Sequence, residues 1–267
     1  MAKTNMAANR VKPANAEPLI LRVLRSTRIS PGFVRVTFGG DDLARFTPMG
    51  FDQWFRLFIP VSDDSLSKVP DRLTAASYVR LLATPRATRP IVRNYTVRAH
   101  RAEGPELDVD FVVHGDGPAG TWAGNCAVGD RVAIIDEGIT FAPPPSTREF
   151  VLVADESGLP AVAGVLASLD AGATGRAVIE VGVAEDRQDL IAPAGVEVTW
   201  VVRADPHAVP GRAALAAAEA LPVPTDRFLG WVVGEAALAT GLRRHWVRAG
   251  VPKEDIVFCG YWRAPKR

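Results

Sequence analysis

The first half of the chain alternates apolar and polar positions with a period of two. The alternation is clearest at residues 19–24, 33–38, 54–59, 107–113 and 131–135. A strand with one buried and one solvated face alternates in this way, because successive side chains point to opposite faces. Short strands separated by Gly, Pro and Asp turns predict an antiparallel Greek-key β-barrel. The polar stretch 63–77 interrupts this pattern and predicts a loop or short helix inserted in the barrel.

The pattern changes after three consecutive prolines, Pro143 to Pro145. Prolines lack the backbone donor that a central strand needs, so they predict a stiff, extended linker. Beyond them, continuous apolar runs alternate with segments of helical period; the runs lie at 150–154, 177–183, 196–202, 228–233 and 256–259, and the helical segments at 159–169, 212–221 and 236–249. This alternation predicts an α/β domain with a parallel sheet.

The predicted organisation therefore has four parts. Residues 1–16 show no periodicity and are expected to form a disordered tail. Residues 17–142 are expected to form the barrel domain, 143–147 the linker, and 148–267 the α/β domain.

Composition narrows the classes of function. The 267 residues carry a formal net charge of +1, which gives no global attraction to nucleic acid or to a membrane, so any electrostatic function must be local. Cys126 and Cys259 are far apart and outside any metal-ligand spacing, which indicates two reduced thiols. No apolar run reaches the length of a membrane span. We expect a cytoplasmic monomer.

The segment Arg93-Asn94-Tyr95-Thr96 is the first candidate for chemistry. On a strand, Arg93 and Tyr95 share one face and Thr96 lies on the other. Arg93 could bind a pyrophosphate, Tyr95 could lie against a flavin ring, and Thr96 could bond the ring's polar edge, which suits FAD. The alternative is an exposed strand whose aromatic residue packs on the barrel.

The second candidate is the glycine-rich segment 114–123, directly after a predicted strand. Its glycines let the backbone approach a ligand, and a short helix beginning near Ala119 would direct free N–H groups at phosphate. Glycine-rich turns are common, so this segment alone is weak evidence for a phosphate site. Its position some 20 residues after Arg93 makes the prediction more specific.

Together with other segments, these motifs resemble the siderophore-interacting protein family of flavin-dependent ferric-siderophore reductases, within the ferredoxin-reductase-like superfamily. The matching segments, in chain order, are 93–96, 110–115 with 117–119 and 122–123, 155–161, 234–235 with 243–244, and 260–263. The resemblance implies an oxidoreductase with an FAD-binding barrel and a nicotinamide-dinucleotide-type second domain. It also implies that Fe(III) in a ferric siderophore is reduced to Fe(II).

The resemblance implies a set of FAD-binding positions: Arg93, Asn94, Tyr95, Thr96, Val112, His114, Ala119, Gly120, Thr121 and Trp122. The chain departs from the family at Gly120, where many relatives carry Ser or Thr. The hydroxyl contact to phosphate is therefore expected to shift to Thr121 or to be lost.

The resemblance further implies a nicotinamide site beyond the carboxyl ends of the parallel strands, at Asp155, Glu156, Ser157, Gly234, Glu235 and Trp262. NADPH or NADH is the expected electron donor. Two acids in the turn would repel a pyrophosphate, so a ferredoxin-type donor remains an alternative. Trp262, with Tyr261, is expected either to cover the flavin or to cap the core of the sheet.

An anionic ferric siderophore calls for a basic docking site. Relatives carry Lys at the position of Arg56, so Arg56, then Arg131 and Arg263, are the candidates for binding substrate, with Lys266 and Arg267 as weaker choices. Each could instead be a solvated surface charge. No catalytic acid, base or nucleophile is expected, because the cofactor carries the chemistry. Alternative functions are a flavin reductase or diaphorase acting on quinones or proteins, and a siderophore-binding protein without redox activity.

Overall fold

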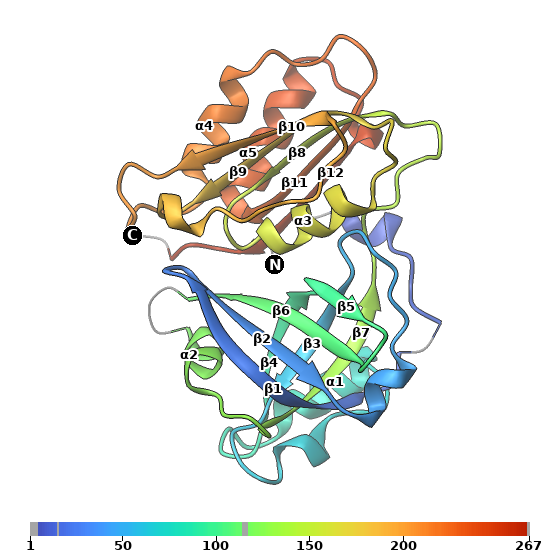
Figure 1. The fold of residues 1–267 in the computed structure, drawn as a ribbon. Coiled ribbons are helices and arrows are strands. Elements are labelled where there is room, and N and C mark those ends of the chain that lie inside the picture. The colour runs from blue at the N-terminus through green and yellow to red at the C-terminus, as the bar shows by residue number, and fades with distance from the viewer. Residues whose placement is uncertain (1–4, 15, 114–116, 266–267) are drawn as a thin grey trace. The chain divides into compact units, whose positions relative to one another are not determined.

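The computed structural model describes residues 5–14, 16–113 and 117–265, which divide into two compact units (Figure 1). One unit contains residues 11–49 and 53–139; the other contains, among the described residues, 5–10, 50–52 and 140–265. The chain thus leaves the first unit briefly between two of its strands.

The first unit is an antiparallel sheet that curls on itself. Its strands are β1 (Leu19–Ser30), β2 (Phe33–Gly39), β3 (Trp54–Ile59), β4 (Ile91–Thr96), β5 (Ala99–Arg101), β6 (Glu106–Val112) and β7 (Arg131–Gly138). They pair in the order β4-β3-β7-β1-β2-β6-β5. Although β4 is an edge strand, Tyr95 of β4 meets Phe111 of β6 with ring centroids 4.3 Å apart, which brings this edge against the strand next to the opposite edge. Alternate residues of the strands, such as Leu21, Val36 and Leu57, fill the interior.

Residues between β3 and β4 cover part of the outer face of this sheet. They form a short 3-10 helix, η3 (Ser65–Lys68), and the helix α1 (Ala75–Ala83). Thr74 caps α1, because its hydroxyl accepts from the Ser77 amide while the Ser77 hydroxyl accepts from the Thr74 amide. Leu81 packs with Phe58 and Ala133 on the outer face. The stretch 63–77, predicted as a loop or a short helix, contains η3 and the first residues of α1, which continues to Ala83.

The second unit is a parallel sheet with helices. Its strands are β8 (Glu149–Ala154), β9 (Thr174–Val181), β10 (Gly195–Val202), β11 (Leu229–Glu235) and β12 (Ile256–Trp262), in the order β10-β9-β8-β11-β12. The helices are α3 (Leu159–Ser168), α4 (Arg212–Ala220) and α5 (Ala236–Arg248). Helices α4 and α5 pack on one face of the sheet, and Figure 1 shows α3 on the other. The predicted fold class is confirmed.

The N-terminal segment differs from the predicted disordered tail. Met6–Asn9 form a 3-10 helix, η1, and Met6 is buried. Asn5 donates to the Ile256 carbonyl and accepts from the Phe258 amide, while Val11 pairs with Ile139. These long-range contacts leave no periodic signal in the sequence, because they bind single residues rather than one face of an element.

The remaining short elements are η2 (Asp41–Arg45), α2 (Pro118–Asn125), η4 (Ala184–Asp186) and η5 (Lys253–Asp255). Across the described residues, none of the helices combines the length and the apolar character that crossing a bilayer requires.

Candidate functional site

The predicted flavin strand lies at the edge of the antiparallel sheet. Arg93 and Asn94 are exposed on β4, Tyr95 is half-buried and Thr96 is buried. Arg93 donates to the carbonyl of its neighbour Val92, which occupies one of its five donors. Tyr95 packs on Phe111, and burial raises the pKa of its phenol, so the ring stays neutral at physiological pH. The strand therefore combines an exposed cation with a neutral aromatic ring.

The second predicted segment starts the helix α2, which lies against β2, β6 and β4. The first helical hydrogen bond runs from the Thr121 amide to the Gly117 carbonyl. The amides of Ala119 and Gly120 precede it, so they are the first-turn donors that a helix leaves unsatisfied internally. A positive dipole end thus lies next to the half-buried Val112 at the end of β6.

The structure explains why glycine occupies position 120, which the sequence alone does not reveal. A Cβ at this position would lie 3.0 Å from the Val112 carbonyl oxygen. Glycine therefore lets the helix start close to the end of β6. Thr121 is exposed one position further along the helix.

Trp122 packs into the barrel. Its ring stacks on Phe38 with centroids 6.2 Å apart and contacts Phe111 at 5.8 Å. Trp122, one of the predicted FAD-binding residues, therefore packs α2 onto the barrel through Phe38 and Phe111. The position of His114 lies outside the described residues.

The fold brings the two predicted flavin segments together, because α2 contacts β4. An exposed guanidinium, a half-buried neutral aromatic ring and a helix N-terminus are the groups that suit the phosphates and the flat ring of FAD. These residues fit the cofactor.

The predicted nicotinamide residues also cluster, at the carboxyl edge of the parallel sheet. Asp155 follows β8 and is fully buried. It accepts from the Ser157 amide and hydroxyl at 2.9 and 2.5 Å, from the Glu235 amide at 2.7 Å, and from Trp262 Nε1 at 3.2 Å. Burial raises the pKa of its carboxyl group. Asp155 therefore ties the ends of β8, β11 and β12 together.

Gly234 makes this arrangement possible. Its φ is +127°, and a Cβ there would lie 2.6–2.7 Å from the Asp155 carboxylate. The next residue, Glu235, caps α5 by accepting from the Ala237 amide, and it also accepts from the Ala264 amide at 3.1 Å.

A buried ion-pair network that the sequence analysis missed lies beside this cluster. Arg203, which follows β10, pairs with Glu156 and, at 3.0 Å, with Glu180. Glu180 also accepts from the Gly211 and Ala214 amides at 2.9 and 2.7 Å at the start of α4. The one available signal was a charged residue, Glu180, inside the apolar run of β9.

These contacts revise the expected repulsion of a pyrophosphate by the turn after β8. Asp155 is surrounded by four donors, and the charge of Glu156 is compensated by Arg203. Both acids face inward, so the turn presents backbone groups and the half-buried Ser157 rather than free carboxylates.

The predicted substrate-binding arginines have different surroundings. Arg56 pairs with Glu137 at 2.5 Å and lies over the rings of Trp54 and Tyr78 at 5.8 and 5.9 Å. Arg131 is exposed at the start of β7, and Arg263 is exposed after β12 in the other unit. Because Glu137 offsets its charge, Arg56 is less available to an anionic ligand than its sequence position suggested. Lys266 and Arg267 lie outside the described residues.

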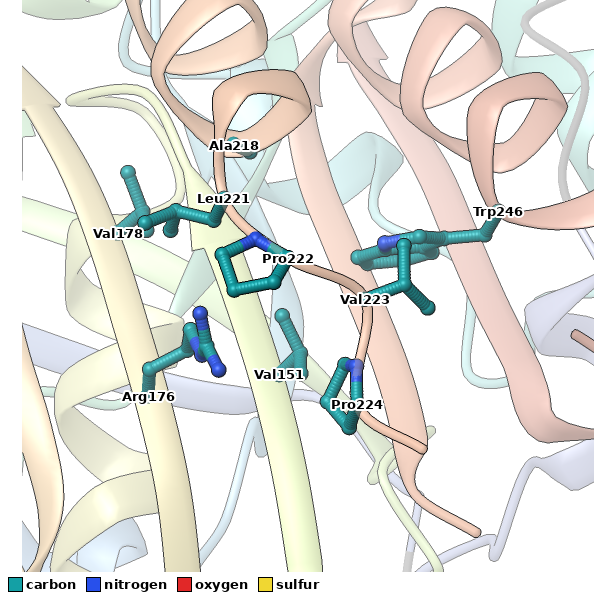
Figure 2. Close-up of a pocket in the computed structure, with 9 residues that line it drawn as sticks. All are labelled: Val151, Arg176, Val178, Ala218, Leu221, Pro222, Val223, Pro224 and Trp246. Carbon is teal, nitrogen blue, oxygen red and sulfur yellow. The ribbon is translucent and has the colours of Figure 1, made fainter. Parts of the chain in front are cut away.

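A recess between the α4–β11 connection and the sheet offers no cofactor site (Figure 2). Its lining is mostly apolar, including Leu221, Val223 and Trp246, with the Arg176 side chain at one side. Its volume of ≈ 10 Å³ corresponds to about one water molecule.

Comparison with solved structures first defines the class of fold. A crystal structure of a siderophore utilization protein from T. fusca matches with a TM-score of 0.78 and 33% identity, covering 97% of each chain. Among more distant matches, a ferredoxin NADP+ reductase from Neisseria gonorrhoeae with bound FAD and NADP gives a TM-score of 0.62 at 14% identity, covering 93% of this chain and all of the other. The chain therefore has the ferredoxin-reductase-like fold.

Sequence comparison then gives the family. The siderophore-interacting FAD-binding domain matches residues 22–140, and the siderophore-interacting protein domain matches residues 147–265. The NADPH-dependent ferric-chelate reductase of Escherichia coli is 31% identical over 247 residues, with 91% of this chain and 92% of the relative covered. The ferric vibriobactin reductase of Vibrio cholerae is 29% identical over 262 residues, covering 93% and 90%. This chain belongs to the siderophore-interacting protein family, as its motifs predicted.

Proposed function

We propose that this protein is an FAD-containing oxidoreductase that reduces Fe(III) in ferric siderophores to Fe(II), with NADPH as the electron source. The observation that carries the proposal is the meeting of β4 and the start of α2 inside the matched FAD-binding domain. The relatives named as ferric reductases support the choice of substrate.

In this proposal, Arg93 forms charge-assisted hydrogen bonds with the cofactor's pyrophosphate, and the amides of Ala119 and Gly120 bind the same group. The ring of Tyr95 lies against the flavin, and the polar edge of the flavin contacts Asn94, Thr96 and the backbone of Val112. The Thr121 hydroxyl contacts the pyrophosphate. Trp122 holds α2 on the barrel through Phe38. His114 is retained as a contact on the strength of the family resemblance.

A hydride carrier gives two electrons together, whereas Fe(III) accepts one. Bound FAD would accept the two electrons and pass them on one at a time. The protein's own residues bind and orient, and we assign none of them a general acid, base or nucleophile role. One hydride therefore reduces two ferric ions, and the siderophore oxygens then hold the softer Fe(II) less tightly.

For the second unit, we propose that NADPH binds at the carboxyl edge of the parallel sheet, over the turn after β8. Ser157 and the backbone of that turn contact the dinucleotide. The conformation of the turn is held by buried residues around it, namely Asp155, Glu156, Gly234 and Glu235. Trp262, held by Asp155, forms one wall. NADH and a ferredoxin-type donor are the alternatives.

For the substrate, we propose that Arg131 and Arg263 attract the anionic chelate, with a smaller contribution from Arg56. A cytoplasmic location and a monomeric state complete the proposal. The absence of a nucleic-acid partner rests on the net charge of +1.

Anaerobic stopped-flow spectroscopy tests the function. The flavin is reduced with NADPH or, separately, NADH, and its reoxidation by a panel of ferric chelates and quinones is followed. We expect faster reduction by NADPH and faster reoxidation by ferric siderophores. A preference for quinones would instead favour a diaphorase, and purified protein without flavin absorbance that takes up no FAD would favour a binding protein.

A further inference from the structure

The helix α1 exposes an apolar face. The ring of Tyr78 in this face lies beneath Arg56, whereas Val79 and Leu82 have no part in the proposed redox function. Within this fully described helix, Leu81 is buried against the barrel, whereas Tyr78, Val79 and Leu82 are 38%, 65% and 50% exposed. At 100° per residue, these side chains lie within about one third of the helix circumference. Ala75 and Ala83 are exposed on the same side. An amphipathic helix of a soluble domain normally turns such a face inward.

The segment around this face is strongly basic. Between residues 72 and 93 the sequence contains five arginines and no acidic residue: Arg72, Arg80, Arg86, Arg89 and Arg93. Within the described part of the chain, Arg72, Arg80 and Arg86 are exposed and form no ion pair. The net charge of +1 thus conceals a local excess of positive charge next to exposed apolar side chains.

Shape and charge together select the occupant of this surface. The side chains protrude from a convex helix, so they do not enclose a small molecule. A second copy of the chain, paired face to face through α1, would bring both sets of arginines together and be repelled. An anionic bilayer offers what both features require, because its headgroups attract the arginines and its acyl boundary accepts Val79, Leu82 and the ring of Tyr78.

We propose that α1, with the arginines of residues 72–89, docks the protein onto an anionic lipid surface. The helix lies in the plane of the headgroups with Val79 and Leu82 directed into the bilayer. The attachment is peripheral and reversible, since one short helix and a few charges give only a weak anchor. It places the protein at a membrane while the fold remains outside the bilayer.

Vesicle sedimentation of the FAD-loaded protein tests this proposal. The probes are vesicles of phosphatidylglycerol with phosphatidylethanolamine, and neutral vesicles of phosphatidylcholine. We expect binding to the anionic vesicles, weak binding to the neutral ones, and release as salt is raised, because salt screens the arginines. Val79→Asp with Leu82→Asp should lower the partition coefficient by about tenfold or more. Arg80→Gln with Arg86→Gln should lower it by a similar factor.

Val128→Asp is the matched control, because Val128 is 75% exposed in the same unit but lies before β7. It should bind as the unchanged protein does. Flavin content and melting temperature, measured for every variant, separate loss of docking from misfolding. Equal binding of both vesicle types, or unchanged binding by the α1 variants, would overturn the proposal. The proposal would also be overturned if the protein did not bind the vesicles but bound an acidic ferredoxin through α1, since the surface would then recognise a protein.

Discussion

Arg93 and Arg56 lie on neighbouring strands, yet their side chains have different surroundings. Arg93 is exposed on β4, whereas Arg56 of β3 is half-buried and paired with Glu137. Strand alternation predicted that Arg93 shares a face with Tyr95, whereas the pairing of Arg56 with Glu137 came only from the register of β3 against β7. At the scale of the residue, the guanidinium of Arg93 is therefore available to a ligand, whereas the guanidinium of Arg56 is held by Glu137.

Arg93→Ala should weaken FAD binding, because it removes a charge-assisted hydrogen bond to the pyrophosphate. Such bonds contribute about 2 kcal/mol, or roughly 30-fold in Kd. Titration of the apoprotein with FAD, followed by flavin fluorescence, measures the change. Arg86→Ala, an exposed arginine of the same basic segment, serves as the control and should retain its affinity. Equal affinity of both variants would remove Arg93 from the phosphate site.

Arg56→Ala should mainly lower stability, by about 1–3 kcal/mol, because its partner Glu137 has a side chain only 7% exposed. Urea denaturation of Arg56→Ala, Glu137→Ala and the double variant gives the coupling energy, which we expect to be about 1–2 kcal/mol. The KM for an anionic ferric chelate should change little. A large rise in KM with unchanged stability would instead make Arg56 a substrate contact.

At the scale of the element, the carboxyl edge of the parallel sheet depends on close approaches between strand ends. Asp155 accepts hydrogen bonds from the ends of β11 and β12, and Arg203 joins the end of β10 to Glu180 of β9. The strands themselves follow from their apolar runs. Their cross-links depend on single polar residues that no periodicity reveals.

Gly234→Ala should destabilise the protein by more than about 2 kcal/mol, because it combines a positive φ of +127° with a Cβ placed against the Asp155 carboxylate. Chemical denaturation measures this loss. The contrasting variant is Gly124→Ala in α2, where a Cβ meets nothing within 4 Å. It should raise stability by about 0.5–1 kcal/mol, since alanine favours the helix. A mild effect at Gly234 would show that the edge can rearrange around Asp155.

At the scale of the whole molecule, the chain consists of two units with separate cores. The proposed FAD-binding residues fall in one unit, and the proposed dinucleotide-binding residues fall in the other. A ligand that binds only the folded state raises the free energy of unfolding of the unit that holds it. FAD and the dinucleotide should therefore each stabilise a different unit.

Calorimetry with FAD and with NADP+ should show this separation. FAD at about 100 times its Kd adds roughly 2.7 kcal/mol to the folded state, and NADP+ adds less if it binds more weakly. We expect the two ligands to shift different parts of the melting profile. Arg93→Ala should reduce the FAD shift and leave the NADP+ shift unchanged. A loss of both shifts in that variant would contradict separate sites.

The sequence by itself determined the order of strands and helices, the two classes of sheet and the segments that mark the family, because these depend on local periodicity and short motifs. It also located the residues 93–96 and the start of α2. Only the tertiary structure decided that Asp155 and Glu156 turn inward, that Arg56 is paired, that residues 5–10 join the second unit, and that α1 leaves Val79 and Leu82 exposed. Each of these depends on which distant residues meet, and that is fixed when strands pair and helices pack rather than by any local pattern.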